Sequence, residues 1–388
     1  MRSLDLQKQI LNAINRALFD RAVLTCDNQS SQEELFALSK SQNITALVAE
    51  GLRRSGDYES LIPEFDRLSE NYLFQYVQQS VETERLTLAL NQRKCSYVLL
   101  KGARMRGFYP QPHLRTSCDI DILTAESDET VCEIMAAMGY RFTVDAGTTL
   151  NFEKPPALEF EMHRRLFSDP EEFGGYFHSI WERTIPVSEG SVERVLTEED
   201  FYVYMIAHLA KHVDKYGCGI RPLVDVYLYH QKLPATFDRK KADQILTSTG
   251  LLRFERRICA LTSAWFETGV LSEADEKLTD FLFGSGLYGN DSLKAANEMR
   301  KRDHKRMGRC GLFFRYVFPP MRIMRPMYPR LLKCGIFLPI AWVMRWIRLL
   351  FSGRKHASDT LRWLKSIDDQ YVDTVSSVIT EFGLEEAH

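Results

Sequence analysis

Apolar residues recur at helical spacing through the first part of the chain. Residues 63–93, "PEFDRLSENYLFQYVQQSVETERLTLALNQR", predict one long amphipathic helix, because their apolar side chains return at every third or fourth position. The same spacing is found upstream at Leu35, Leu38, Ile44, Leu47, Val48 and Leu52. We therefore expect residues 1–93 to be helical.

The pattern changes near residue 97. "YVLLKG" is a short continuous apolar run that ends at Gly102, which favours a buried strand. "ARMRGFY" then predicts a short helix, "PQPHLRTS" a loop and "CDIDILT" the next strand. "SDETVCEIMAAMGY" predicts a helix with Ser127 as its N-cap. "RFTVD" and "LNFEK" predict a hairpin around Ala146 and Gly147.

A further strand is predicted in "ALEFEMHRRLF". Glu159, Glu161 and His163 alternate there with apolar residues, so they share one face of the strand. Beyond Thr197 the spacing is helical again, in "TEEDFYVYMIAHLAKHVDKYG" and "GIRPLVDVYLYHQKL". The chain is therefore expected to divide into four parts: a helical region (1–93), an α/β core (94–190), a helical domain (191–300) and a basic helical region (301–388).

The composition is that of an ordinary globular protein. The 388 residues are 45% hydrophobic and 26% charged, and a net charge of −2 gives no general reason to expect nucleic-acid binding. Eight scattered cysteines without a CxxC pair argue against a zinc ribbon or a disulfide framework and suit a reducing cytoplasm. The first twenty residues are typical of an amphipathic helix rather than a signal peptide. We expect a cytoplasmic location.

The charge is unevenly distributed, however. Residues 304–358 contain twelve lysines and arginines and no acid, mixed with aromatic and apolar residues and interrupted by prolines. The first interpretation is a docked pair of C-terminal helices with solvated arginines. The second is peripheral contact with a membrane, since anionic lipid attracts such segments. Nucleic-acid binding comes third, because no known reader motif accompanies the charge.

Two acids stand at alternate positions of the strand "CDIDILT". Asp119 and Asp121 point the same way, so their repulsion requires a compensating arginine, lysine or metal ion. With Glu161 from another strand they would form a trio suited to phosphoryl or nucleotidyl transfer, because Mg²⁺ prefers oxygen ligands that it shares with phosphates. The alternative is the polar face of a half-solvated edge strand, whose other face carries Ile120 and Ile122.

The strand before this one offers a site for phosphate. Gly102 stands between a strand and a helix, where backbone amides can approach a phosphate and the helix N-terminus adds partial positive charge. Lys101 and Arg115 could balance the charge of a triphosphate from either side.

Together, "LLKG…Y…R…DIDIL…EMH" resembles the DNA polymerase β-like nucleotidyltransferase superfamily. In that superfamily a Gly-containing turn, commonly Gly-Ser, precedes the strand with the metal-binding DxD. The sequence is closer still to a bacterial branch of uncharacterised nucleotidyltransferases, through Lys101-Gly102, Tyr109-Pro110, Arg115 to Leu123, and Glu161-Met162-His163. The resemblance implies an α+β fold, with a small mixed sheet and helices at its core and helical N- and C-terminal regions.

The resemblance also implies roles for single residues. Asp119, Asp121 and Glu161 would be catalytic and would bind Mg²⁺ or Mn²⁺. The nucleotide would be bound by Lys101, Gly102, Arg115 and Ser117. Substrate-binding roles fall to His163, His208, His212, Arg221 and Asp225. Simpler readings stay open for the last group: a hydrogen-bonded histidine at the edge of the core, packing histidines, and a local Arg221–Asp225 ion pair one helical turn apart.

The expected function is metal-dependent transfer of NMP from an NTP to a hydroxyl of a small molecule, such as a sugar, with release of pyrophosphate. This is an activity of the EC 2.7.7 type. No stable nucleic-acid complex is expected. The alternatives are toxin-like NMP transfer to a protein or tRNA, a nucleotide-binding regulatory protein without turnover, and a membrane-associated assembly factor built around the basic region.

Overall fold

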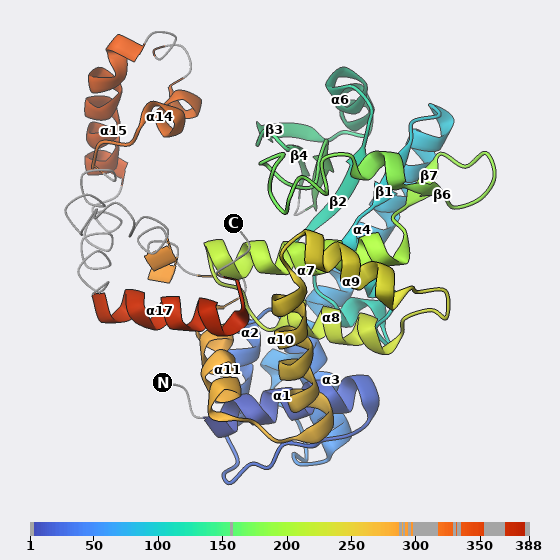
Figure 1. The fold of residues 1–388 in the computed structure, drawn as a ribbon, viewed down its shortest axis with the longest axis vertical. Coiled ribbons are helices and arrows are strands. Elements are labelled where there is room, and N and C mark those ends of the chain that lie inside the picture. Colours follow the sequence, from blue (N-terminus) through green and yellow to red (C-terminus); the bar gives the residue numbers. More distant parts are fainter. Residues whose placement is uncertain are drawn as a thin grey trace. The chain divides into compact units, whose positions relative to one another are not determined.

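A computed structural model of the protein describes residues 4–155, 158–286, 289, 292–293, 296–297, 317–328, 331, 335–352 and 369–384 (Figure 1). The chain forms two compact units. The first comprises Met1–Val213, Cys218–Tyr288 and Thr380–His388, and the second comprises Asp214–Gly217 and Gly289–Ile379. The four-part division expected from the sequence stays a prediction.

Helices make up the N-terminal part of the first unit, as expected. They are α1 (Leu4–Phe19), α2 (Gln32–Ser41), α3 (Thr45–Ser55) and α4 (Pro63–Gln92). The start of α2 is a capping box, in which the Ser31 side chain accepts a hydrogen bond from the Glu34 amide and the Ser31 amide donates one to the Glu34 carboxylate. Pro63 starts α4, where its missing amide hydrogen costs nothing.

The core of the first unit is a seven-stranded mixed sheet with the strand order β3-β4-β5-β2-β1-β7-β6. The strands are β1 (Tyr97–Leu99), β2 (Asp119–Thr124), β3 (Arg141–Asp145), β4 (Thr149–Lys154), β5 (Leu158–His163), β6 (Ile185–Pro186) and β7 (Glu193–Val195). The strand with the two aspartates, β2, lies in the centre, with β5 parallel on one side and β1 antiparallel on the other. The edge-strand interpretation of this segment is therefore wrong.

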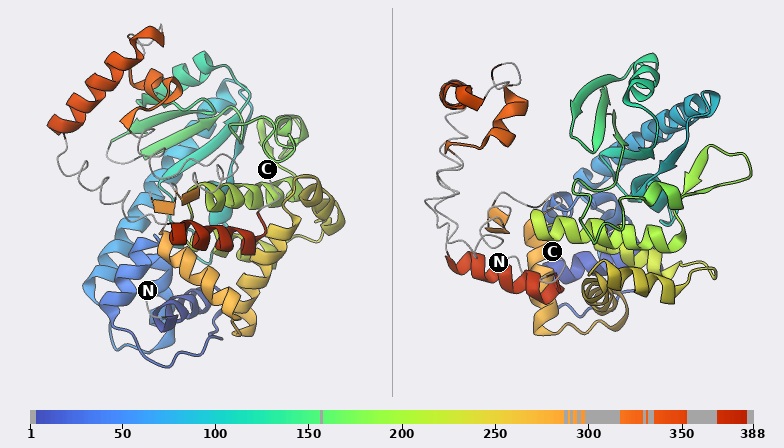
Figure 2. Two further views of the ribbon diagram at one scale, coloured as in Figure 1. Left: turned by 60° about the vertical axis from the view of Figure 1, so that its left-hand side comes forward. Right: turned by 45° about the horizontal axis from the view of Figure 1, so that its top comes forward.

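One face of the sheet is apolar and covered by helices. Alternate residues of the strands, among them Ile120, Ile122 and Phe160, join a buried cluster with residues of α4 and of α6 (Asp128–Ala137). The ribbon views in Figure 2 show the sheet with the helices around it. Ser127 caps α6 by accepting a hydrogen bond from the Thr130 amide, as expected. Because side chains alternate along a strand, Asp119 and Asp121 are turned toward the opposite face.

One of the remaining helices lies between β1 and β2, and the others follow the sheet in sequence. They are the short α5 (Lys101–Arg106) after β1, and then α7 (Glu198–Lys215), α8 (Arg221–Gln231), α9 (Arg239–Ser248), α10 (Leu252–Ser263) and α11 (Glu273–Ser285). The last two residues of α7 are counted in the second unit. Single turns occur at η1 (Pro112–Leu114), η2 (Ile180–Arg183) and η3 (Ala264–Thr268). The apolar residues that predict α7 and α8 are almost all buried.

The second unit contains α14 (Met321–Met327), the turn η6 (Gly335–Phe337), α15 (Leu338–Ser352) and most of α17 (Asp369–Phe382). Met324 of α14 and Ala341 of α15 are fully buried against each other's helix. The basic segment 304–358 is only partly covered, since residues 304–316, 329–330, 332–334 and 353–358 lie outside the described residues. Among the helices that the structure describes, none is long and apolar enough to cross a membrane.

Candidate active site

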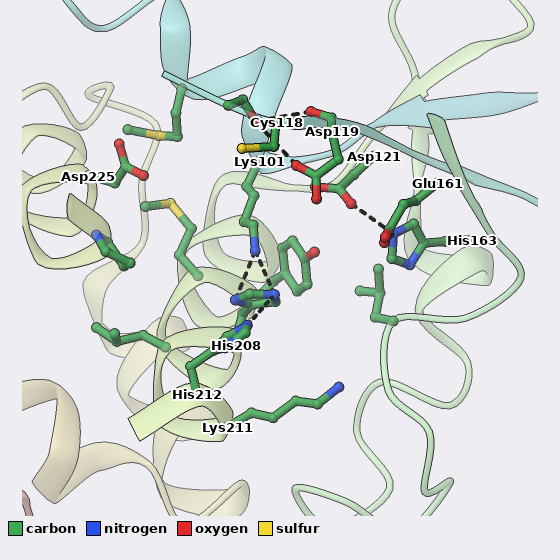
Figure 3. Close-up of a pocket in the computed structure, with 18 of the residues that line it drawn as sticks. Lys101, Cys118, Asp119, Asp121, Glu161, His163, His208, Lys211, His212 and Asp225 are labelled. Carbon is green, nitrogen blue, oxygen red and sulfur yellow. Dashed lines mark hydrogen bonds and ion pairs between the residues drawn. The ribbon is translucent and has the colours of Figure 1, made fainter. Parts of the chain in front are cut away.

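The polar face of the sheet forms one wall of a cavity of about 410 Å³ in the first unit. Strands β2, β4 and β5 contribute to this wall, and α5, α7 and α8 supply residues from the other sides (Figure 3). All the residues that the sequence indicates as a site line this cavity: Lys101, Gly102, Arg115, Ser117, Asp119, Asp121, Glu161, His163, His208, His212, Arg221 and Asp225.

The three acids come together through the pairing of two strands. Asp121 of β2 is the direct register partner of Glu161 of β5 in a parallel ladder, and Asp119 lies two residues before Asp121 on the same face. In Figure 3 the carboxylates of Asp119 and Asp121 lie side by side. The side chain of Asp121 is 12% exposed and that of Glu161 is 31% exposed, so both reach the cavity from a mostly buried position.

A histidine joins the carboxylates. His163 Nε2 lies 3.0 Å from Asp121 Oδ1 and 3.7 Å from Glu161 Oε2. One ligand atom from each of these three residues lies within 4.8 Å of those of the other two, which is a spacing that a single metal ion can bridge. Asn151 of β4 donates a hydrogen bond of 3.0 Å to the other oxygen of Glu161 and so fixes the orientation of that carboxylate.

The acids differ in how readily they ionise. Burial would raise the pKa of Asp121, but the hydrogen bond from His163 and the charges of His163, Lys101 and Arg115 lower it to about 2. Burial and the neighbouring Asp121 charge raise the pKa of Asp119. Burial and the charges of Asp121 and Asp119 likewise raise the pKa of Glu161. The cluster therefore holds concentrated negative charge that a cation would relieve.

The donor set of this wall fits a hard divalent cation. Three carboxylates from adjacent strands offer the oxygen ligands that Mg²⁺ prefers, and they open into a cavity that has room for phosphates. Nδ1 of His163 is buried and has no hydrogen-bond partner among the described residues, so the ring is held through Nε2. The oxygen ligands fit the expected Mg²⁺ or Mn²⁺; the cluster with the spacing of a metal site is Asp121, Glu161 and His163, and the assignment of Asp119, Asp121 and Glu161 as the ligands stays a prediction.

The turn before β2 lies against the acids. Ser117 Oγ donates hydrogen bonds to the Asp119 carbonyl oxygen at 3.0 Å and to Asp119 Oδ1 at 3.3 Å. Gly102, at the start of α5, lies directly opposite: a Cβ atom there would stand 3.6 Å from Ser117 Oγ and 4.0 Å from Asp121 Oδ2. The missing side chain leaves the α5 backbone open to the space beside the acids.

Basic and histidine side chains form the wall opposite the acids. Lys101 Nζ lies within 2.8 Å of both ring nitrogens of His208, and His212 Nε2 lies 3.3 Å from His208 Nε2 (Figure 3). Burial lowers the pKa of Lys101 to about 8, although the charges of Asp121 and Asp119 oppose this shift. Burial and the Lys101 charge hold the pKa of His208 well below its ordinary value, so the imidazole is neutral near pH 7.

Arg115 is held by a partner from a distant part of the chain. Its Nε and Nη2 atoms donate to the two carboxylate oxygens of Asp225 at 2.9 and 2.8 Å, and its Nη1 donates to the Gly102 carbonyl at 3.3 Å. Tyr109 donates to the same Asp225 carboxylate at 2.9 Å. The resemblance implies a phosphate contact for Arg115, whereas here the guanidinium connects Asp225 of α8 with the Gly102 carbonyl of α5.

Arg221 also has a different partner from the one its spacing allows. Both carboxylate oxygens of Asp225 accept hydrogen bonds from the Arg115 guanidinium in a bidentate pair. The local Arg221–Asp225 ion pair is therefore not formed. Arg221 Nη1 instead donates to the Thr116 carbonyl at 2.8 Å. The positive charge of Arg221 stabilises the ionised form of Asp119, and so it partly offsets the rise in the Asp119 pKa that burial and the Asp121 charge cause.

Three further residues of the cavity were not indicated by the sequence pattern. Asn151 holds Glu161, Tyr204 is a buried residue of α7, and Lys211 follows on the same helix. Burial and the charges of Asp121, Asp119 and Glu161 raise the pKa of Tyr204 well above its ordinary value. In the sequence Tyr204 is indistinguishable from the core aromatics around it, and Asn151 is one polar residue of a hairpin.

Comparison with known proteins gives one match. The model of a family described as uncharacterised nucleotidyltransferase matches residues 28–267, which is 240 of the 388 residues. Searches of curated proteins and of solved structures found no significant match. The matched range includes the sheet, α7, α8 and every residue of the cavity wall named above. The chain belongs to this family of uncharacterised nucleotidyltransferases.

Proposed function

We propose that the protein is a metal-dependent nucleotidyltransferase that transfers NMP from an NTP to a hydroxyl group of a small-molecule acceptor, such as a sugar, and releases pyrophosphate. The observation that carries this proposal is the parallel pairing of Asp121 with Glu161 beside Asp119, at a cavity that Lys101, Lys211 and Arg221 also line. Family membership supports the reaction class, and the geometry supports the residues.

Each wall has a separate task in this proposal. Asp119, Asp121 and Glu161 hold the cation, which when bound neutralises phosphate charge and polarises the phosphorus–oxygen bond that breaks. The amides at the start of α5 receive a phosphate at Gly102, and Lys101 and Arg221 neutralise charge from the opposite side. His163 keeps Asp121 ionised and oriented through its hydrogen bond.

The size of the cavity supports a small acceptor. A volume of about 410 Å³ lies within the range of sites that enclose small molecules, roughly 300–1,000 Å³. Lys211 and His212 of α7 also line the cavity and are the proposed contacts for the acceptor. A small-molecule hydroxyl is therefore favoured over a protein or tRNA target.

Metal-dependent nucleotide binding tests the proposal without knowledge of the acceptor. Titration calorimetry with non-hydrolysable analogues of the four NTPs should show binding in Mg²⁺ or Mn²⁺ and its loss in excess EDTA, because the acids repel a triphosphate when no cation is present. Equal binding with and without the metal, or no binding of any NTP, would contradict the proposal. Mass spectrometry of acceptor panels, with pyrophosphate detection, then identifies the product.

Gly102→Ala should weaken nucleotide binding without weakening the fold. The new methyl group would meet Ser117 Oγ at 3.6 Å, an ordinary contact, and alanine is the better helix former, so the free energy of unfolding should not fall. The methyl group would occupy the space where a phosphate approaches the amides, and loss of such a charge-assisted hydrogen bond costs about tenfold in affinity. Calorimetry with the NTP analogue measures this loss.

The matched control for this change is Gly107→Ala at the other end of α5. Among the described residues, a Cβ atom there meets only the Arg104 carbonyl oxygen, at 3.6 Å, and Gly107 does not line the cavity. Its NTP affinity should stay at the level of the unchanged protein. Equal affinities for Gly102→Ala and the unchanged protein would exclude close approach of a phosphate at Gly102.

A further inference from the structure

The two helices α14 and α15 of the second unit form a hairpin, and the two tryptophans of α15 pack and form hydrogen bonds within it. The ring of Phe318 lies between those of Trp342 and Trp346, with centroid distances of 5.1 and 5.0 Å. Both indole nitrogens donate to backbone carbonyls, Trp342 to Pro319 at 2.8 Å and Trp346 to Val317 at 2.7 Å. The polar atoms of the indoles are thus satisfied inside the hairpin, and this side of α15 is fixed.

The other side of α15 is apolar and exposed. Ile340, Val343, Met344 and Ile347 follow one another at positions i, i+3, i+4 and i+7, so they form a single stripe, and each is 46–50% exposed. Further large apolar side chains of the hairpin that are exposed are Ile323, Met327, Ile336 and Phe337. A helix that is apolar on its packed side and on its exposed side is unusual for a water-facing element.

The charge around this stripe has one sign. Residues 304–358 contain twelve lysines and arginines and no acid. Arg325 of α14 and Arg348 of α15 are exposed, and Arg348 directly follows Ile347, the last residue of the stripe. A surface that combines large apolar side chains with unopposed positive charge is complementary to the headgroup region of a membrane that contains anionic lipid.

We propose that the α14–α15 hairpin docks the protein on an anionic membrane surface, with the Ile340–Ile347 stripe in the interface and the arginines at the lipid phosphates. α15 has fifteen residues and is about 22 Å long, which suits a helix that lies in the plane of the interface. A second copy of the chain would bring two cationic hairpins together, which their charges oppose. A nucleic acid would leave the apolar stripe without a partner.

Co-sedimentation of the full chain with vesicles tests this proposal. The probe is vesicles of phosphatidylcholine in which about a third of the lipid is phosphatidylglycerol, compared with vesicles of phosphatidylcholine alone. The protein should sediment with the anionic vesicles, and added salt should weaken the binding, because screening reduces the attraction of the arginines. The test does not depend on the proposed transferase activity.

Two double variants separate the apolar and the charged contributions. Ile340→Gln with Ile347→Gln should lower the vesicle partition coefficient at least about tenfold, because two large side chains no longer enter the interface. Arg325→Gln with Arg348→Gln should lower it about 5-fold for each arginine removed. Both pairs are exposed, so the fold should persist, which circular dichroism checks.

The chain offers matched controls for both variants. Val77 and Val81 of α4 are 49% and 51% exposed, so Val77→Gln with Val81→Gln removes equally exposed apolar side chains elsewhere. Arg67→Gln with Lys94→Gln removes two exposed cations outside the basic segment. Both controls should bind vesicles like the unchanged protein. The proposal is overturned if the full chain binds neither vesicle, if the controls lose as much binding as the α15 variants, or if the α15 changes dissociate a dimer and leave vesicle binding unaltered.

Discussion

Asp121→Asn is expected to lower nucleotidyl transfer by about 10³-fold or more while the chain stays folded. Asparagine keeps the size of the side chain and its hydrogen bonding but removes the negative charge that pairs in register with Glu161 and lies 3.0 Å from His163. The cation then loses a ligand on the central strand. Initial rates of pyrophosphate release in Mg²⁺ measure the effect, and titration with Mn²⁺ should show the corresponding loss of metal affinity.

Glu159→Gln is the control for this prediction. Glu159 lies on β5 two residues before Glu161 and is the register partner of Asp119, yet its side chain is exposed and does not line the cavity. The neutralisation of one acid on the same strand should leave the rate unchanged. If Asp121→Asn kept the full rate, the acids of this wall would not carry the reaction, and the assignment of Asp119, Asp121 and Glu161 as metal ligands would be wrong.

Asp225→Ala is expected to lower the free energy of unfolding by about 3–5 kcal/mol, because it leaves a buried arginine without its counter-charge. The side chains of Arg115 and Asp225 are only 3% and 8% exposed, and the carboxylate also accepts the hydrogen bond of Tyr109. Urea denaturation monitored by circular dichroism measures the loss. NTP affinity should fall as well, since Arg115 also holds the Gly102 carbonyl.

An exposed ion pair in the same unit serves for comparison. Arg53 and Asp66 pair with side chains that are 44% and 57% exposed, and water screens such a pair, so Asp66→Ala should change the stability little. If both variants unfolded at the same urea concentration as the unchanged protein, the Arg115–Asp225 pair would have no structural importance. Loss of NTP affinity without loss of stability would instead show that Arg115 acts on the nucleotide.

Much of the sheet could be predicted because its strands carry strong local signals. The alternation in "CDIDILT" and "ALEFEMH" shows which residues face the cavity, and β2 and β5 follow these boundaries closely. The position of β2 at the centre of the sheet was harder to predict from the sequence. A half-polar strand has the same pattern at an edge as it has beside a buried cavity, because what covers the polar face comes from α7 and α8, about 80 to 100 residues later.

The hydrogen-bond and ion-pair partners of the site residues could not be predicted from the local sequence pattern either. Asp225 stands one helical turn from Arg221, and this spacing predicts a pair between them, but the carboxylate instead meets Arg115, 110 residues earlier in the chain. The shortest strands left no signal, since β6 has two residues and β7 three. Tyr204 was missed because a buried aromatic on an apolar helix is read as core, whether or not it faces acids.

The central place of β2 also limits how this gene can change. Both edges of the strand are hydrogen-bonded, to β5 and to β1, so the backbone cannot bulge to absorb an inserted or deleted codon. Slippage by one residue would turn Ile120 and Ile122 toward the cavity and drive both aspartates into the apolar cluster beneath. Length variation among descendants of this sequence should therefore avoid residues 119–124 and collect in the surface turns, such as the one at Gly147.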